Sequence, residues 1–132
     1  MGKSLQCEFA NFDNPDGQTT PVEQFSRGVS PVGVWDMCGN VSEWVNDWYD
    51  SRYYADSPDT NPQGPSGGHQ KVHRGGACHE NRNGIRGKSR HFSMPSASQD
   101  YIGFRCAMDF REFSARSTPP PDPTGRFANS TR

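Results

Sequence analysis

The chain has 132 residues, which is enough for one domain at most, and its formal net charge is -1 at pH 7. This small charge, with a pI near 6.4, gives no reason to expect binding to nucleic acid or to an anionic membrane. Only 30% of the residues are hydrophobic, and 14 Gly and 11 Pro predict a loop-rich fold with a small core. No apolar run approaches the ~20 residues that span a bilayer, so direct membrane insertion is not expected, and no secretion signal is visible after Met1.

The predicted elements are short. Residues 1–30 are polar and rich in turn signals, so we expect no long helix there. Residues 41–49 alternate partly between two faces and predict a short strand or an irregular extended segment. A long loop over 50–68 precedes a short strand over 71–76 that ends at a Gly pair. Residues 102–107 alternate apolar with other side chains and predict a strand with one buried face.

The composition changes after Phe113. Residues 117–125 are dominated by Pro, Ser and Thr, and such a segment can neither bury a core nor form a strand ladder. We therefore expect a domain over 1–113 and a Pro-rich tail over 114–132 that is disordered or bound to a partner. Asn129 begins an N-glycosylation triplet, a pattern that often occurs by chance.

The cysteines and histidines leave alternatives open. No C-x-x-C pair is present, so a zinc site of the usual spacing is not expected. Two disulfides with three alternative pairings, or free half-buried thiols, both agree with the sequence. The cysteines are Cys7, Cys38, Cys78 and Cys106. A metal site around Cys78 could be formed by the histidines, although hydrogen-bonded or surface histidines are the commoner case. The histidines are His69, His73, His79 and His91.

Three motifs carry most of the information. Residues 33–44 read GVWDMCGNVSEW, with Asp36 and Glu43 around a turn-forming Gly-Asn pair; residues 74–76 read RGG, and residues 102–105 read IGFR. In this order and at this spacing they resemble the formylglycine-generating enzyme or sulfatase-modifying factor domain, in which the first motif reads GLYDMxGNVWEW. Further agreement lies at residues 47–49, 61–65 and 72–76, and at Arg86, Arg90 and Pro95.

The resemblance covers residues 10–107 and implies the C-terminal half of such a domain. It implies an α+β, loop-rich variant of the C-type-lectin-like fold with little regular structure, and it is compatible with an extracytoplasmic location. The family's N-terminal half, which packs against this half, is not matched. We therefore expect a protein partner or a second copy of the chain to cover apolar faces left without that half. These faces are at Trp35, Trp44, Val72, Ile102 and Phe104.

The resemblance also implies a structural calcium site in the first motif. Calcium takes six to eight oxygen ligands from carboxylates, amides and carbonyls. Asp36 and Glu43 would supply side-chain oxygens, and Gly39 and Val41 would supply backbone carbonyls. The alternative from the residues alone is that Asp36 caps a turn and that Glu43 pairs with an arginine.

A second calcium site is implied upstream, in a loop shorter than that of the enzymes. Its ligands would be the side chains of Asn11 and Asp16 and the carbonyls of Phe12 and Gln18. In this shorter loop Asp13 could replace Asp16.

The catalytic cysteines of the family are not found. Active members carry two cysteines shortly after the Gly pair, which bind copper and use oxygen to oxidise a substrate cysteine. The register set by Arg86, Arg90 and Gly103 puts Cys78 where most relatives have Trp and leaves both catalytic positions without cysteine. Copper(I) favours soft thiolates, so copper is not expected here. Cys106 lies where the family often has a disulfide cysteine.

Two further groups of side chains have alternative roles. The arginines could form an anion-binding patch, but a guanidinium with five donors is also suited to organising loops through carbonyls and carboxylates, which we favour. They are Arg74, Arg86, Arg90 and Arg105. The aromatic residues Trp48, Tyr49, Tyr53 and Tyr54 could form a ligand surface, although we expect Trp48 in the core.

The sequence thus favours a non-catalytic, calcium-stabilised binding or assembly module of the sulfatase-modifying-factor type, acting as a subunit of a larger assembly. One alternative is a formylglycine-generating enzyme, or a fragment of one, that needs residues outside this chain. Another is the variable ligand-binding protein of a diversity-generating system. The sequence does not decide whether the chain is an enzyme, although the missing cysteine pair favours a non-catalytic role.

Overall fold

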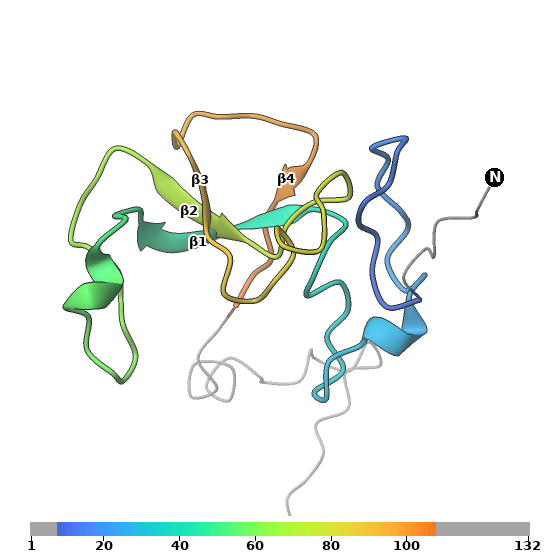
Figure 1. The fold of residues 1–132 in the computed structure, drawn as a ribbon, viewed down its shortest axis with the longest axis horizontal. Coiled ribbons are helices and arrows are strands. Elements are labelled where there is room, and N and C mark those ends of the chain that lie inside the picture. Colours follow the sequence, from blue (N-terminus) through green and yellow to red (C-terminus); the bar gives the residue numbers. More distant parts are fainter. Residues whose placement is uncertain (1–7, 108–132) are drawn as a thin grey trace, which may run out of the picture.

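The computed structural model describes residues 8–107 of the chain. One four-stranded sheet and two short 3-10 helices lie among long turns (Figure 1), which confirms the predicted loop-rich α+β class. The helices are η1 (Ser26–Gly28) and η2 (Tyr53–Ala55), and the strands are β1 (Ser42–Trp48), β2 (Lys71–Arg74), β3 (His91–Ser93) and β4 (Ile102–Gly103). No helix in this described part is both long and apolar enough to cross a membrane.

The sheet has the order β3-β2-β1-β4. β1 pairs antiparallel with β2, with Glu43 opposite Arg74, and parallel with β4, with Glu43 opposite Gly103. β2 in turn pairs antiparallel with β3. Because Glu43 lies near the start of β1, this register brings the three sequence motifs together at one end of the central strand.

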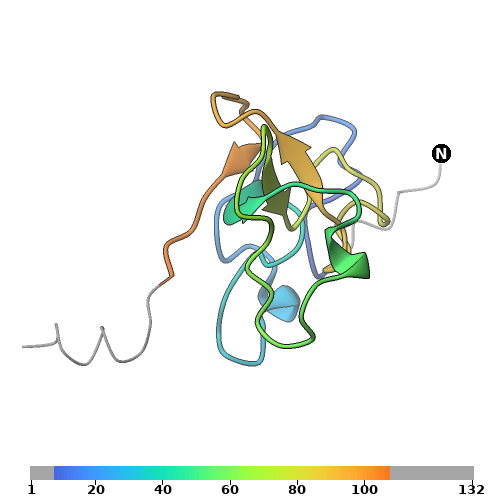
Figure 2. The same cartoon turned by 90° about the vertical axis from the view of Figure 1, so that its left-hand side faces the viewer.

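Most of the predicted strands are confirmed, but their lengths differ. β1 and β2 fall within the predicted 41–49 and 71–76. The strand predicted over 102–107 is too long, because pairing ends at Gly103 and the exposed residues 104–107 lead away from the sheet (Figure 2). β3 was not predicted, since three residues are too few to show a period. Cys7 and the predicted tail over 114–132 lie outside the described residues.

The core of the described part is small. Its buried apolar residues are Ala10, Val72, Ala77 and Cys78. Phe104 is 77% exposed, as expected for an uncovered face, but the expectation for Val72 was wrong. Val72 is only 1% exposed, so the described residues already cover its side chain. With so little buried apolar surface, hydrogen-bonded turns must contribute much of the order.

The other apolar positions are half-buried. Trp35, Trp44 and Ile102 have intermediate exposure, so each keeps only part of its surface in water. Trp48 is also half-buried rather than in the core, and the Lys71 Nζ lies 4.1 Å from its ring centre. These residues therefore form a partly covered layer around the sheet.

Candidate functional site

The Gly-Asn turn of the first motif fastens three segments together. The Asn40 backbone N–H donates to the Asn11 carbonyl at 2.8 Å, and the Gly39 backbone N–H donates to the Gly75 carbonyl at 2.8 Å. The Asn40 carbonyl accepts from the Cys78 amide at 3.0 Å. Gly39 and Asn40 have φ values of 77° and 64°, a left-handed conformation that Gly and Asn adopt most readily. The residue types of this motif are thus set by its backbone.

The Asn40 side chain ties the upstream loop to this turn. It is 6% exposed, and its Oδ1 accepts from the Thr20 amide at 2.8 Å. Its Nδ2 donates to the Thr20 carbonyl at 3.1 Å and to Asp36 Oδ2 at 3.3 Å. Asn11 Nδ2 also donates to Asn40 Oδ1 at 3.3 Å. The side-chain amide of Asn40 therefore connects the two loops in which calcium sites are predicted.

Glu43 pairs with an arginine, which was the alternative to calcium in the first motif. Arg105 donates from Nε to Glu43 Oε2 at 2.6 Å and from Nη2 to Glu43 Oε1 at 2.5 Å. It also donates to the carbonyls of Trp35 and Asp36, at 3.0 Å and 3.2 Å. The hydrogen bond to Glu43 raises the pKa of Arg105 further above its usual range. A fixed positive charge therefore lies where the motif's carboxylates gather.

The donor chemistry of this loop still fits calcium. Arg105 Nη2 contacts both the Glu43 carboxylate and the Asp36 backbone carbonyl, so these two oxygens face one small region. Within residues 8–107, no three His, Cys, Asp or Glu side chains converge on one point, so an ion would also need carbonyl or amide oxygens. Calcium accepts such mixed oxygen sets. Binding would require Glu43 to be shared with Arg105 or released from it.

The upstream loop brings part of the second predicted set together. Asn11 Nδ2 lies 2.9 Å from the Gln18 carbonyl, and Asn14 Nδ2 lies 3.1 Å from the same oxygen. Asn14, which the sequence analysis did not single out, also donates to Asn11 Oδ1 at 3.3 Å. Asp13 and Asp16 are exposed on this loop, and Phe12 is half-buried. Asn11 and Gln18 are thus adjacent, whereas the acidic candidates lie at the surface.

The cysteines of the described part are all free. Cys78 is fully buried, and its Sγ donates to the Gly17 carbonyl at 3.1 Å. Burial raises the pKa of the half-buried Cys38, whereas a reactive cysteine needs a lowered pKa. Cys106 is exposed. Cys38 thus lacks the environment of an activated thiolate, and Cys78 is closed to solvent.

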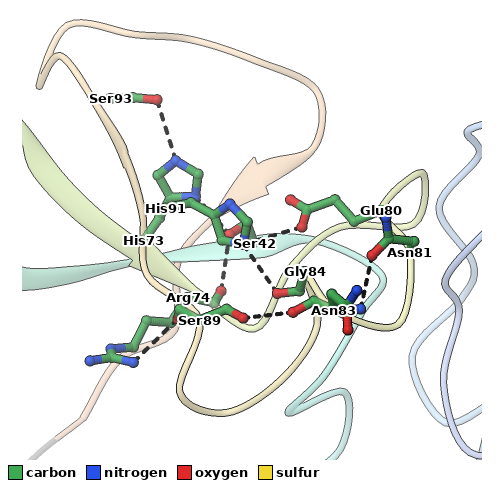
Figure 3. A network of polar contacts seen from close by, with 10 residues as sticks. All are labelled: Ser42, His73, Arg74, Glu80, Asn81, Asn83, Gly84, Ser89, His91 and Ser93. Carbon is green, nitrogen blue, oxygen red and sulfur yellow. Dashed lines mark hydrogen bonds and ion pairs between the residues drawn. The ribbon is translucent and has the colours of Figure 1, made fainter.

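A polar network crosses one face of the sheet (Figure 3). His73 is 5% exposed, and its Nδ1 lies 2.7 Å from Ser42 Oγ. Because Ser42 donates its proton to the Arg74 carbonyl at 3.0 Å, His73 donates from Nδ1 to Ser42. The other ring nitrogen, Nε2, then accepts from Ser93 Oγ at 3.3 Å. Ser42 is fully buried, so this serine–histidine pair is closed to a substrate.

The histidines do not gather around Cys78. The rings of His73 and His91 stack at 5.6 Å, and burial, followed by the charge of His91, lowers the pKa of His73. His91 Nε2 lies 3.2 Å from Glu80 Oε2 and 3.1 Å from the Gly84 carbonyl. His79 packs edge-on against Tyr101 at 4.6 Å. The hydrogen-bonded role expected as the commoner case is confirmed at His73 and His91.

Three of the four singled-out arginines organise loops, as favoured from the sequence. Arg74 donates to the carbonyls of Gly87 and Ser89, at 3.1 Å and 3.3 Å. Arg90 donates to the Asp50 carbonyl at 3.1 Å, and Arg105 acts as described above. The fourth, Arg86, is exposed. The long loops are therefore held by guanidinium-to-carbonyl contacts.

A family model described as the sulfatase-modifying factor enzyme 1-like domain matches residues 2–110 of the chain. The chain belongs to this family. This sulfatase-modifying factor-like chain is 44% identical over 94 residues to the formylglycine-generating enzyme of Streptomyces coelicolor. The aligned region covers 69% of the chain and 29% of that protein. The chain is also 40% identical over 108 residues to the serine/threonine-protein kinase pkn1 of Chlamydia caviae. That alignment covers 80% of the chain and 17% of the kinase. The chain thus spans less than a third of these relatives.

Solved structures agree with this assignment. PvdO from Pseudomonas aeruginosa matches with a TM-score of 0.63 and 32% identity, over 78% of this chain and 40% of that one. Treponema denticola variable protein 1 matches with a TM-score of 0.65 and 24% identity, over 79% and 37%. The second likeness concerns the fold alone. The predicted family is confirmed, and the calcium sites, the partner and the domain boundary stay predictions.

Proposed function

We propose that this sulfatase-modifying factor-like chain is a non-catalytic, calcium-stabilised binding or assembly module. The observation that carries the proposal is the environment of Cys78, whose thiol is fully buried and donates its proton to the Gly17 carbonyl. Oxidation of a substrate cysteine through copper requires accessible thiolates that share the ion. A fully buried thiol does not offer the access that this reaction needs.

The second candidate is a formylglycine-generating enzyme, or a fragment of one. It is favoured by the 44% identity to the Streptomyces coelicolor enzyme over 94 residues. On this reading the oxidising residues would come from outside the chain. The variable-protein reading gains only a shared fold, because the identity to the Treponema denticola protein is 24%.

We expect that the chain does not convert the cysteine of a sulfatase-type peptide into formylglycine, with or without copper. The physical reason is that Cys78 is closed to solvent and that Cys38 has a raised pKa. The measurement is mass spectrometry of the peptide after aerobic incubation with the full chain. Aldehyde formation that Cys78→Ser abolishes, and that the exposed control Cys106→Ser leaves intact, would contradict the proposal.

Calcium would serve the fold rather than a reaction. Asp36 and Glu43, with the carbonyls of Gly39 and Val41, would hold one ion in the first motif. The ion would supply positive charge at the end of β1, where the three motifs meet. Asn11 and the Gln18 carbonyl would form the centre of the upstream site, because Asn11 Nδ2 already lies 2.9 Å from the Gln18 carbonyl oxygen.

We expect calcium to raise the melting temperature of the wild-type chain. An ion that binds only the native state stabilises it by about 2.7 kcal/mol at a hundredfold excess over Kd. Glu43→Gln should lose most of the calcium-dependent shift, because a neutral amide is a weaker ligand for a hard cation. Glu23→Gln, at an exposed residue outside both loops, is the matched control. The measurement is thermal melting with calcium and with a chelator, and identical wild-type curves would rule out both sites.

Exposed apolar side chains support the assembly part of the proposal. Val32 is 84% exposed, Phe104 is 77% exposed and Val22 is 67% exposed. Apolar surface of this kind on a soluble protein commonly marks an interface when it forms a contiguous patch. We propose that a partner subunit or a second copy of the chain covers part of it.

A further inference from the structure

The helix η2 lies at the opposite end of the molecule from η1 (Figure 1). Arginine and aromatic side chains gather around its Tyr54. We call this group of side chains the arginine–tyrosine surface; its members are Arg74, Arg90, Tyr49, Tyr54 and Phe92. The rings of Tyr49 and Phe92 stack with centres 3.9 Å apart. The Arg90 guanidinium lies 4.3 Å from the Tyr54 ring centre and 5.2 Å from that of Tyr49. Arg74 Nη2 donates to the Tyr54 hydroxyl at 2.6 Å.

The two guanidiniums of this surface have no acidic partner in the part of the chain described. The ion pairs there join Arg27 to Glu8, His91 to Glu80 and Arg105 to Glu43. Arg74 and Arg90 contact only neutral oxygens, namely backbone carbonyls and the Tyr54 hydroxyl. Each guanidinium has five N–H donors, so both retain donors for a further acceptor. Both positive charges therefore remain available to an anionic ligand.

The sequence concentrates positive charge beside this surface. Residues 81–99 contain no Asp or Glu, although the whole chain has a net charge of -1. Their basic residues are Arg82, Arg86, Lys88 and Arg90. This segment includes β3 and the loop that leads into it. A partner that meets this region gains most by carrying carboxylates.

Apolar contact area and a strand edge adjoin the same charges. Tyr54 is 50% exposed, Phe92 is 43% exposed and Met94 is 53% exposed. β3 is the outer strand of the sheet and pairs only with β2 within residues 8–107. An edge strand offers unpaired backbone groups to an extended peptide, and neighbouring side chains supply specificity.

We propose that the arginine–tyrosine surface and the edge of β3 dock an acidic, extended peptide of a protein partner. Carboxylates of the peptide contact Arg74 and Arg90, and an apolar side chain lies against Tyr54 and Phe92. The exposed apolar area and the strand edge favour a peptide over a nucleic acid. The proposal rests on the binding role proposed above and names the partner's chemistry.

The test is fluorescence anisotropy of a labelled peptide of alternating Glu and Phe, titrated with the full chain. A peptide with Lys in place of Glu and a single-stranded oligonucleotide of equal charge serve as comparison ligands. We expect saturable binding of the acidic peptide that weakens with salt, and at least tenfold weaker binding for Arg90→Gln. Arg27→Gln removes the same charge near η1 and should bind as the wild type does.

A second variant protects the test against misfolding of Arg90→Gln. The Lys88 side chain is exposed and makes no hydrogen bond or ion pair within the described residues, so Lys88→Gln should keep the fold and weaken binding several-fold. Equal weakening by Arg27→Gln, absence of peptide binding, or tighter and Arg90-dependent binding of the oligonucleotide would each overturn the docking proposal. None of these outcomes would change the result expected for calcium-dependent melting. Aldehyde formation on the sulfatase-type peptide would overturn the proposed function but not the docking proposal.

Discussion

Gly39→Ala is expected to destabilise the chain by roughly 2–5 kcal/mol. A Cβ at this position would overlap the Asn11 carbonyl oxygen and lie 3.1 Å from the Asn11 carbonyl carbon. That oxygen accepts a hydrogen bond from the Asn40 backbone N–H at 2.8 Å. A shift of the Asn11 carbonyl away from the new Cβ therefore breaks a buried hydrogen bond. An L residue in the left-handed region costs about 1–2 kcal/mol, and a buried group left unsatisfied costs about 1–3 kcal/mol more. The total of roughly 2–5 kcal/mol is a large share of the about 5–15 kcal/mol by which native domains are stable.

Gly33→Ala is the matched control for this substitution. Gly33 has a φ of 80°, close to the 77° of Gly39, but an added Cβ would meet nothing within 4 Å. The control therefore carries the conformational cost without the overlap. Thermal and urea melting should show a modest loss for Gly33→Ala and a much larger loss for Gly39→Ala. Equal curves for the two variants would show that the contact with Asn11 does not matter.

Asn40→Ala should cause a loss of stability of similar size, about 2–5 kcal/mol. The amide donates to the Thr20 carbonyl and to Asp36, and accepts from the Thr20 amide and from Asn11. Alanine leaves the buried or half-buried partners without their acceptor or donor, at about 1–3 kcal/mol for each group that water cannot reach. It also lacks the tolerance of asparagine for a φ of 64°.

Asn40→Gly separates these two causes, because glycine adopts the left-handed conformation freely. We expect Asn40→Gly to retain most of the loss, since the side-chain contacts dominate. Hydrogen exchange should show a faster Thr20 amide in both variants, in addition to a lower urea midpoint. Wild-type stability in Asn40→Gly would contradict the role of the amide.

The motifs allowed much of the central sheet to be predicted. Residues 41–49 and 71–76 contain β1 and β2, and the favoured use of arginine for carbonyls holds at Arg74 and Arg90. β3 was missed because three residues show no period. The partner of Glu43 was open among four arginines, and the parallel pairing of β1 with β4 selects Arg105, two residues after Gly103.

The role of the Asn40 side chain could not be predicted for a related reason. The sequence marks Gly39-Asn40 as a turn, and the positive φ values of both residues agree. The side-chain amide of Asn40, however, contacts Thr20, which is 20 residues earlier in the chain. No periodicity or local propensity links residues so far apart, so only the packed structure identifies the contact.

The parallel pairing of β1 with β4 also governs how the chain can fold. Arg105 bonds the Trp35 carbonyl across 70 residues, and Cys78 bonds the Gly17 carbonyl across 61 residues. Closing such long loops loses chain entropy before any stabilising contact forms, which makes folding slow for a protein of this size. During synthesis, Glu43 has no guanidinium partner until residue 105 has left the ribosome. Until β4 has been synthesised, the nascent chain therefore carries β1 unpaired on one side, which exposes it to aggregation.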